Sequence, residues 1–168
     1  MNVIVTAYNP NWPALYEQEA QAIRQILGKE LIAIHHIGST SVPGLFAKPI
    51  IDIDVVISDY SIFDTVTDKL RTIGYFHEGD LGIKDRETFR YADKPHLQAH
   101  HLYVCLRDSK ELFRHITFRI FLKNHPEAVK KYSDVKETAA RLFLDDIDKY
   151  MAYKAPCVEE ILALCGLC

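Results

Sequence analysis

Two acidic side chains on one predicted strand follow a turn whose residues could hold a phosphate. The turn is Gly38-Ser39-Thr40, which comes after an apolar run over residues 31–37. Glycine allows the backbone to approach a ligand closely, and the hydroxyl and N–H groups beside it can bind an anion. Asp52 and Asp54 come next, in a β-branched run over residues 50–57 that predicts a strand. Strand alternation places both carboxylates on one face, roughly 6–7 Å apart.

The chemistry that these two motifs suggest is phosphoryl or nucleotidyl transfer. Two acidic oxygens at that spacing can share a divalent metal, and Mg²⁺ or Mn²⁺ is expected because these ions accept carboxylates together with substrate phosphates. The pattern resembles the signature of the nucleotidyltransferase superfamily, the fold shared by DNA polymerase beta and the antibiotic nucleotidyltransferases. Two structural alternatives stay open. Ser39 and Thr40 could cap the next helix, and Asp52 and Asp54 could lie on an exposed strand face.

The elements that must position these residues follow from apolar periodicity and from glycine and proline punctuation. The predicted helices cover residues 12–27, 62–73, 111–123, 126–143 and 145–164, and the predicted strands cover 31–37, 50–57, 87–92 and 99–106, with a further strand starting at Tyr75. Asn11 is expected to cap the first helix. The pattern predicts an α+β fold: a nucleotidyltransferase-like mixed β-sheet with flanking helices. One domain over residues 1–168 is expected, with a helical C-terminal part over about 110–168.

Composition argues against a nucleic-acid or membrane partner. The 168 residues carry a net charge of −3, and no segment concentrates Lys and Arg. No stretch reaches the length of a membrane span and the N-terminus lacks a signal-peptide pattern, so a soluble, cytoplasmic protein is expected. Four cysteines, Cys105, Cys157, Cys165 and Cys168, are expected to be reduced. A zinc or redox role for Cys165 and Cys168 is disfavoured because no second pair accompanies them.

The third acidic group of such a site is harder to find. A nucleotidyltransferase needs a later carboxylate to help bind metal and to take a proton from the attacking hydroxyl, and the predicted strand over 99–106 contains none. His101 falls near the expected position. One hypothesis is therefore a catalytic and metal-binding set of Asp52, Asp54 and His101, in which imidazole shifts the preference toward Mn, Fe or Zn. The alternative is that His101 hydrogen-bonds a polar group of the core.

Several cations could hold the phosphates of a nucleotide. The candidates are Lys48, Arg86, Arg90, Arg119, Lys136 and Lys154. Arg90 and Arg119 are the first choices, because Arg90 is predicted on the strand next to His101 and Arg119 in a helical segment that faces the sheet. Together with Lys48 and the Gly38-Ser39-Thr40 turn they make up the predicted phosphate site.

Longer segments resemble the GrpB family over nearly the whole chain. They are Tyr-Asn-Pro-Asn-Trp at 8–12, His-Ile-Gly-Ser-Thr-Ser-Val-Pro-Gly-Leu at 36–45, Lys-Pro-Ile-Ile-Asp at 48–52, Gly-Tyr at 74–75, His-Leu-Tyr-Val at 101–104, Phe-Arg at 118–119, and the pair Tyr150 and Lys154. The resemblance implies a nucleotidyltransferase-like fold, and in this family the domain also occurs fused to dephospho-coenzyme A kinase. The family's His-Leu-His-Val and Phe-Arg-Asp-Tyr-Leu motifs are altered at Tyr103 and Ile120. Of these two motifs, His101 and Arg119 are retained.

Three functions from different classes follow. The leading hypothesis is a metal-dependent nucleotidyltransferase that acts on a nucleoside triphosphate and an unknown small-molecule or protein acceptor. The second is a non-catalytic accessory domain that binds a nucleotide or another phosphorylated metabolite, which the missing third carboxylate favours. The third is a metal-dependent phosphohydrolase, which would release phosphate without an acceptor. The sequence predicts no oligomeric state.

Overall fold

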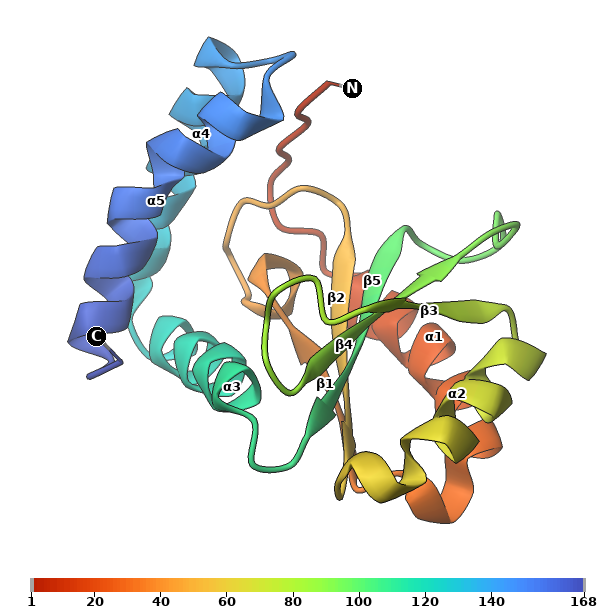
Figure 1. The fold of residues 1–168 in the computed structure, drawn as a ribbon. Helices are drawn as coiled ribbons and strands as arrows, with labels where there is room; N and C mark the ends of the chain where they lie inside the picture. Colours follow the sequence, from red (N-terminus) through yellow and green to blue (C-terminus); the bar gives the residue numbers. More distant parts are fainter. Residues whose placement is uncertain (1, 168) are drawn as a thin grey trace.

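Five strands form one mixed sheet in the computed structural model, which describes residues 2–167. They are β1 (Ala33–Ile37), β2 (Ile51–Ile57), β3 (Tyr75–Gly79), β4 (Arg86–Tyr91) and β5 (His100–Leu106), in the spatial order β1-β2-β5-β4-β3. The central strands β2 and β5 run parallel, and the other neighbouring pairs are antiparallel. The predicted α+β class and mixed sheet are confirmed (Figure 1). Cys168, and with it the Cys165–Cys168 pair, lies outside the described residues.

Helices cover the sheet unequally on its two sides (Figure 1). The helices α1 (Trp12–Leu27) and α2 (Phe63–Thr72) pack on one face and bury the apolar side chains of the central strands. On the other face α3 (Lys110–Lys123) packs through Leu112 against Val56 and Cys105. Beyond it, α4 (Pro126–Leu142) and α5 (Ile147–Leu164) pack against each other and stand beside the sheet. The second face is therefore only partly covered. No helix within residues 2–167 combines the length and apolarity needed to cross a bilayer.

Three short 3₁₀ turns, Gly28–Glu30, Ser39–Ser41 and Tyr60–Ile62, link these elements. The first helix has the predicted bounds, but the predicted side-chain cap is wrong. Asn11 makes no capping hydrogen bond with its side chain; instead its N–H donates to Asn9 Oδ1 at 2.9 Å. The last helix begins at Ile147, two residues later than predicted, because Asp146 is its cap and accepts a hydrogen bond from the Lys149 N–H at 3.0 Å.

A buried acid lies between α1 and the sheet. The Glu19 and His100 side chains are both fully buried, and Glu19 Oε1 lies 3.4 Å from His100 Nδ1. The imidazole N–H at Nδ1 donates to the Gln98 carbonyl at 2.7 Å, so Nε2 accepts from the Tyr75 hydroxyl at 2.7 Å. Burial without a cation raises the pKa of Glu19 to about 8. The folded protein therefore holds Glu19 as a neutral acid near pH 7.

Replacing Glu19 with glutamine is expected to stabilise the protein at pH 8 and to have little effect at pH 4.5. The folded protein keeps the Glu19 proton up to about pH 8, whereas the unfolded chain loses it near 4.5. The unfolding free energy of the wild type therefore falls as pH rises between these values, and glutamine removes a penalty of about 2 to 4 kcal/mol. Urea unfolding at both pH values measures the difference. The exposed Glu17→Gln on the same helix is the control, and an equal gain in both variants would contradict the assignment.

Candidate functional site

The partly covered face of the sheet carries the two predicted carboxylates. Ile51, Ile53 and Val55 of β2 point into the core under α1 and α2, so the alternate residues Asp52 and Asp54 face the other way. Asp52 is a quarter exposed, whereas the Asp54 side chain is fully buried. The two carboxylates therefore share one face, with one of them open to solvent.

Asp52 is held between a histidine and the turn that precedes its strand. In the parallel pair β2 and β5, Asp52 is in register with His101, and the N–H at His101 Nδ1 donates to Asp52 Oδ1 at 2.9 Å. Gly38 lies against the other oxygen, because a Cβ built there would sit 2.4 Å from Asp52 Oδ2. Gly38 also has a positive φ of 73°, which side chains rarely adopt. The turn and the carboxylate are therefore in direct contact.

Replacing Gly38 with alanine is expected to lower the free energy of unfolding by about 2 kcal/mol or more, because the new methyl group must displace Asp52 as well as adopt a strained φ. Gly82→Ala is a matched control, since Gly82 has a φ of 83° and no atom within 4 Å of a built Cβ. Urea unfolding of both variants separates the contact from the strain. If both variants lose the same unfolding free energy, the close contact between Gly38 and Asp52 adds nothing to the cost of an alanine at position 38.

Asp54 is paired with a histidine that sequence analysis did not select. His115 of α3 donates from Nδ1 to Asp54 Oδ2 at 2.7 Å and from Nε2 to Glu111 Oε1 at 3.0 Å. Burial lowers the pKa of His115, but the hydrogen bonds to Asp54 and Glu111 outweigh this effect and raise it to about 9. His115 is therefore an imidazolium at neutral pH. The i,i+4 spacing of Glu111 and His115 on a helix that faces the sheet was the signal that could have revealed it.

A small pocket of about 150 Å³ opens beside Asp52 and is lined by three lysines, Lys48, Lys136 and Lys154. Lys136 of α4 is buried; its Nζ donates to the Phe46 carbonyl at 3.1 Å and is hydrogen-bonded to Ser39 Oγ. Burial, with Lys154 and Lys48 nearby, holds the pKa of Lys136 well below its usual value. The turn residue Ser39 thus contacts a lysine side chain from the helical part of the chain.

Lys154 of α5 is the second buried lysine that lines the pocket. Burial, reinforced by Lys48, lowers the pKa of Lys154 to about 8. Lys154 Nζ lies 5.4 Å from the centre of the Tyr150 ring, and Lys136 Nζ lies 4.3 Å from that of Tyr132. Each lysine follows its tyrosine by one helical turn. This repeated Tyr-x-x-x-Lys spacing is the sequence signal that marks the two lysines as a pair.

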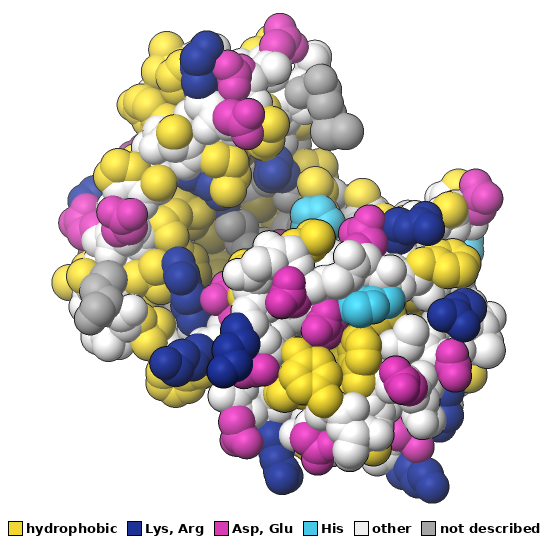
Figure 2. Space-filling model, viewed as in Figure 1, with side chains coloured by type: hydrophobic (Ala, Val, Ile, Leu, Met, Phe, Trp, Pro, Cys, Tyr) yellow, Lys and Arg dark blue, Asp and Glu magenta, His cyan; other side chains and the backbone are white. Residues whose placement is uncertain are grey.

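A wider groove of about 410 Å³ continues from the pocket between α3 and α5. Ser39, Asp52 and Lys154 line both the pocket and the groove. Apolar and aromatic side chains form much of the wall of the groove, namely Phe118, Tyr132, Met151, Val158 and Leu162. Figure 2 shows the hollow between the helical part and the sheet, with Lys or Arg atoms inside it. The combined shape suits a ligand with an anionic end and a less polar body.

Three residues of the predicted phosphate site lie elsewhere. Thr40 is buried and its hydroxyl meets His36 Nε2 at 2.8 Å, and Arg119 Nη1 donates to the His36 carbonyl at 2.6 Å. Arg90 is exposed on β4, 5.4 Å from the centre of the Phe76 ring. None of the three lines the pocket or the groove. Gly38, Ser39, Lys48, Asp52 and His101 each line the pocket, the groove or both.

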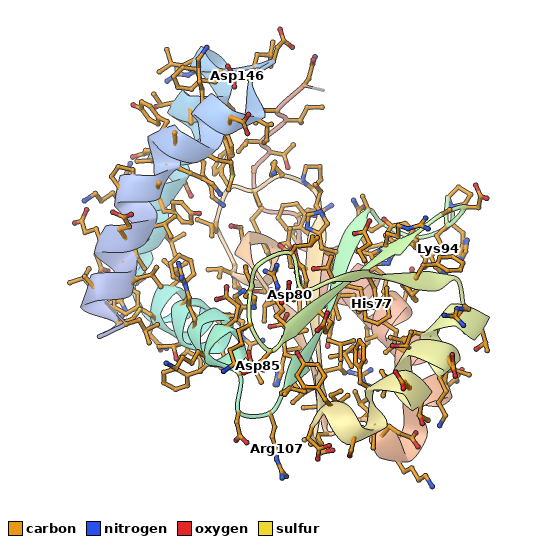
Figure 3. All side chains as sticks on the ribbon, viewed as in Figure 1. His77, Asp80, Asp85, Lys94, Arg107 and Asp146 are labelled. Atoms are coloured by element: carbon orange, nitrogen blue, oxygen red, sulfur yellow. The ribbon has the colours of Figure 1, made fainter. Side chains whose placement is uncertain are left out.

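Other charged side chains of the sheet lie away from this pocket. Figure 3 shows His77 and Lys94 on the β3 side of the molecule, across the sheet from α4 and α5. His77 pairs there with Glu87, Nε2 to Oε2, at 2.7 Å. Lys94 donates to the Ile73 carbonyl at 2.6 Å. The first contact joins β3 to β4 and the second joins the loop after β4 to the end of α2, and neither adds a group to the pocket.

Asp52 and Asp54 carry oxygen atoms of the kind that Mg²⁺ prefers, but Asp54 is fully buried and lines neither the pocket nor the groove. Asp54 Oδ1 is buried and has no hydrogen-bond partner among residues 2–167, and Asp52 lines the pocket beside it. The described residues include no cluster of three or more His, Cys, Asp or Glu side chains placed to hold a metal. A metal here would therefore complete its coordination with substrate phosphate and water, which is how Mg²⁺ is commonly bound.

A family model, a relative and a solved structure that are similar to this chain were found among known proteins. The model of the family described as GrpB protein matches residues 2–164. The UPF0157 protein YqkA of Bacillus subtilis (strain 168) is 32% identical over 152 residues, which are 90% of this chain and 44% of YqkA. This chain thus spans less than half the length of that relative. The crystal structure of conserved protein GrpB from Enterococcus faecalis has a TM-score of 0.82 at 37% identity, covering 96% of this chain and 98% of that one.

The fold also matches that of a polymerase. A mutant of the Cid1 poly(U) polymerase bound to MgATP has a TM-score of 0.54 at 11% identity, covering 78% of this chain and 45% of the polymerase chain. At that identity the likeness concerns the fold alone. The predicted nucleotidyltransferase-like architecture is confirmed at this level.

Proposed function

The chain belongs to the GrpB family, and from that premise and the geometry of the pocket we propose that it binds a nucleoside triphosphate and transfers the nucleoside monophosphate to an acceptor. The acceptor is a small molecule or a protein. One observation carries the proposal: Ser39, Asp52 and three lysines from separate parts of the chain line a single small pocket. A pocket lined by lysines beside a hydroxyl is suited to a polyanion, because charge-assisted hydrogen bonds to phosphate are among the strongest in proteins.

Lys48 and Lys154 bind the phosphates in this proposal. Lys136 and Lys154 are buried enough that their ammonium forms are costly in the free protein. A bound polyphosphate supplies the missing negative charge, so Lys154 gains a proton as the ligand enters, whereas Lys136, whose pKa is held well below its usual value, stays neutral. Lys48 and Lys154 then stabilise the negative charge that develops on the leaving pyrophosphate.

Asp52 and Asp54 would hold the divalent metal, Mg²⁺ or Mn²⁺. When bound there, the metal supplies charge neutralisation on the transferring phosphate. His101 orients Asp52 and His115 orients Asp54 through the hydrogen bonds described above. Such second partners fix the direction of carboxylate oxygens. The Cid1 poly(U) polymerase that shares this fold was bound to MgATP, which agrees with this choice of ligand.

A second function, a non-catalytic domain that binds a nucleotide or another phosphorylated metabolite, is favoured by a specific observation. Both carboxylates already accept a hydrogen bond from a histidine, and the imidazolium of His115 neutralises Asp54 without a metal. In that case the lysine pocket alone would hold the phosphates. Binding would then be independent of divalent metal.

Calorimetric titration of the purified protein with ATP, CTP, GTP and UTP, each with Mg²⁺, with Mn²⁺ or with EDTA, tests the proposal. Metal-dependent binding accompanied by pyrophosphate release supports nucleotidyl transfer. Metal-independent binding without turnover supports the accessory domain, and release of inorganic phosphate without an acceptor indicates a phosphohydrolase. Failure of all four nucleotides to bind contradicts the proposed function.

A further inference from the structure

Ser39 and Lys136 form a hydroxyl–amine pair at the junction of the pocket and the groove. The Lys136 Nζ is hydrogen-bonded to Ser39 Oγ, and Ser39 lines both hollows. Serine is a weak nucleophile by itself, but an adjacent base within hydrogen-bond reach activates it, and lysine is such a base in some serine enzymes. Ser39 and Lys136 are therefore residues of the right types, in contact, to act as a nucleophile and its base.

The surroundings of Lys136 favour a neutral amine in the free protein. The side chain is 3% exposed and faces the Tyr132 ring, and Lys154 and Lys48 are the neighbouring cations. Burial is the main cause of its lowered pKa, and Asp52 opposes the shift only in part. A neutral Nζ has two N–H groups and one lone pair. It can donate to the Phe46 carbonyl and accept the hydroxyl proton of Ser39.

The pocket and the groove also suggest where the phosphate attacked by Ser39 would lie. Lys48 and Lys154 line the small pocket, and apolar side chains line much of the groove. A nucleoside triphosphate with its terminal phosphates in the pocket and its nucleoside in the groove would place the intervening α-phosphate at Ser39. An ester without negative charge would leave the lysines of the pocket unpaired.

We propose that Ser39 is a covalent nucleophile, so that transfer proceeds through a nucleotidyl-serine with Lys136 as the base. This inference rests on the proposed function, which supplies the nucleoside triphosphate. Ser39 Oγ forms a bond to the α-phosphorus, the bond from that phosphorus to the bridging oxygen breaks, and pyrophosphate leaves with the electron pair. The hydroxyl proton passes to Lys136 Nζ. In the second step the oxygen of an acceptor hydroxyl or of water forms a bond to the same phosphorus, the bond from Ser39 Oγ to that phosphorus breaks, Ser39 recovers its proton from Lys136, and the proton of the acceptor passes to solvent.

The test is intact-mass measurement of acid-quenched protein after incubation with each nucleoside triphosphate and Mg²⁺ or Mn²⁺, without an acceptor. Wild type is expected to gain the mass of one nucleoside monophosphate residue, located at Ser39 by tandem mass spectrometry. Ser39→Ala is expected to gain none, and Lys136→Met to be labelled at least about tenfold more slowly. The exposed Ser61→Ala is the matched control and should label as the wild type does.

Nucleotide binding measured on the same proteins separates the two proposals. If wild type binds nucleotide and releases pyrophosphate but carries no label on Ser39 at any quench time, transfer is direct; the serine proposal fails and the proposed function stands. The same conclusion follows if Ser39→Ala transfers at the wild-type rate. If no nucleotide binds, both proposals fail. The mass of the wild-type protein shows whether Ser39 is labelled even if a variant does not fold. Circular dichroism would reveal a variant that does not fold.

Discussion

Replacing Asp52 with asparagine is expected to lower the rate of nucleotidyl transfer by about 1,000-fold or more, which corresponds to about 4 kcal/mol in the activation free energy. Asparagine keeps the shape of the side chain, and its oxygen can still accept the hydrogen bond from His101 Nδ1. It loses the negative charge that would hold a divalent metal beside the pocket. Release of pyrophosphate at saturating nucleotide and metal measures the loss.

Nucleotidyl transfer is expected to require the negative charge of Asp52, and the substitution is expected to leave the fold intact. Asp68→Asn on α2 is the control, because Asp68 is largely exposed and pairs with Arg71 at the surface. Asp68→Asn should retain the wild-type rate, and Asp52→Asn should unfold cooperatively near the wild-type midpoint. Full activity in Asp52→Asn would exclude a metal held by this carboxylate.

Much of the fold could be predicted because its signals are local. The helix over 12–27 is marked by apolar spacing and by Gly28, and the run over 50–57 is rich in β-branched residues. Alternation along that run also gave the shared face of Asp52 and Asp54. The cap of the first helix was predicted wrongly because Asn9 competes with Asn11 for the same turn. Two nearby residues with the same side chain cannot be ranked by type alone.

The pocket was harder to predict because tertiary packing brings its cations together. Lys136 and Lys154 were among the candidate cations, but no spacing along the chain relates α4 and α5 to Ser39. Arg119 was preferred because it was predicted in a helical segment that faces the sheet, yet its guanidinium donates to the carbonyl of His36. Glu19 lies on the apolar face of α1, where periodicity predicts a hydrophobic residue. Sequence patterns therefore located the turn and the carboxylates, and the helical part supplied contacts that only the fold reveals.

Replacing Lys154 with methionine is expected to weaken nucleotide binding about 30-fold at pH 7.5, since a charge-assisted hydrogen bond contributes about 2 kcal/mol. It should also change the pH dependence. In wild type, Lys154 has a pKa of about 8, lowered by burial and then by Lys48, and only its protonated form attracts phosphate. Affinity should therefore fall as pH rises from 7.5 to 9.5. The nucleotide contributes no such change, because its terminal phosphate ionises near pH 6.

The variant should show a shallower fall of affinity over the same range, because its residue 154 does not titrate. Lys48 and Lys136 also line the pocket, so the difference between the two pH profiles, and not either profile alone, belongs to Lys154. Lys149→Met on the same helix is the control. Lys149 pairs with Asp146, which Figure 3 places at the end of the α4–α5 pair, away from the sheet. Parallel pH profiles for wild type and Lys154→Met would show that this lysine does not bind the phosphates, whereas a steeper wild-type profile would place its ammonium group against them.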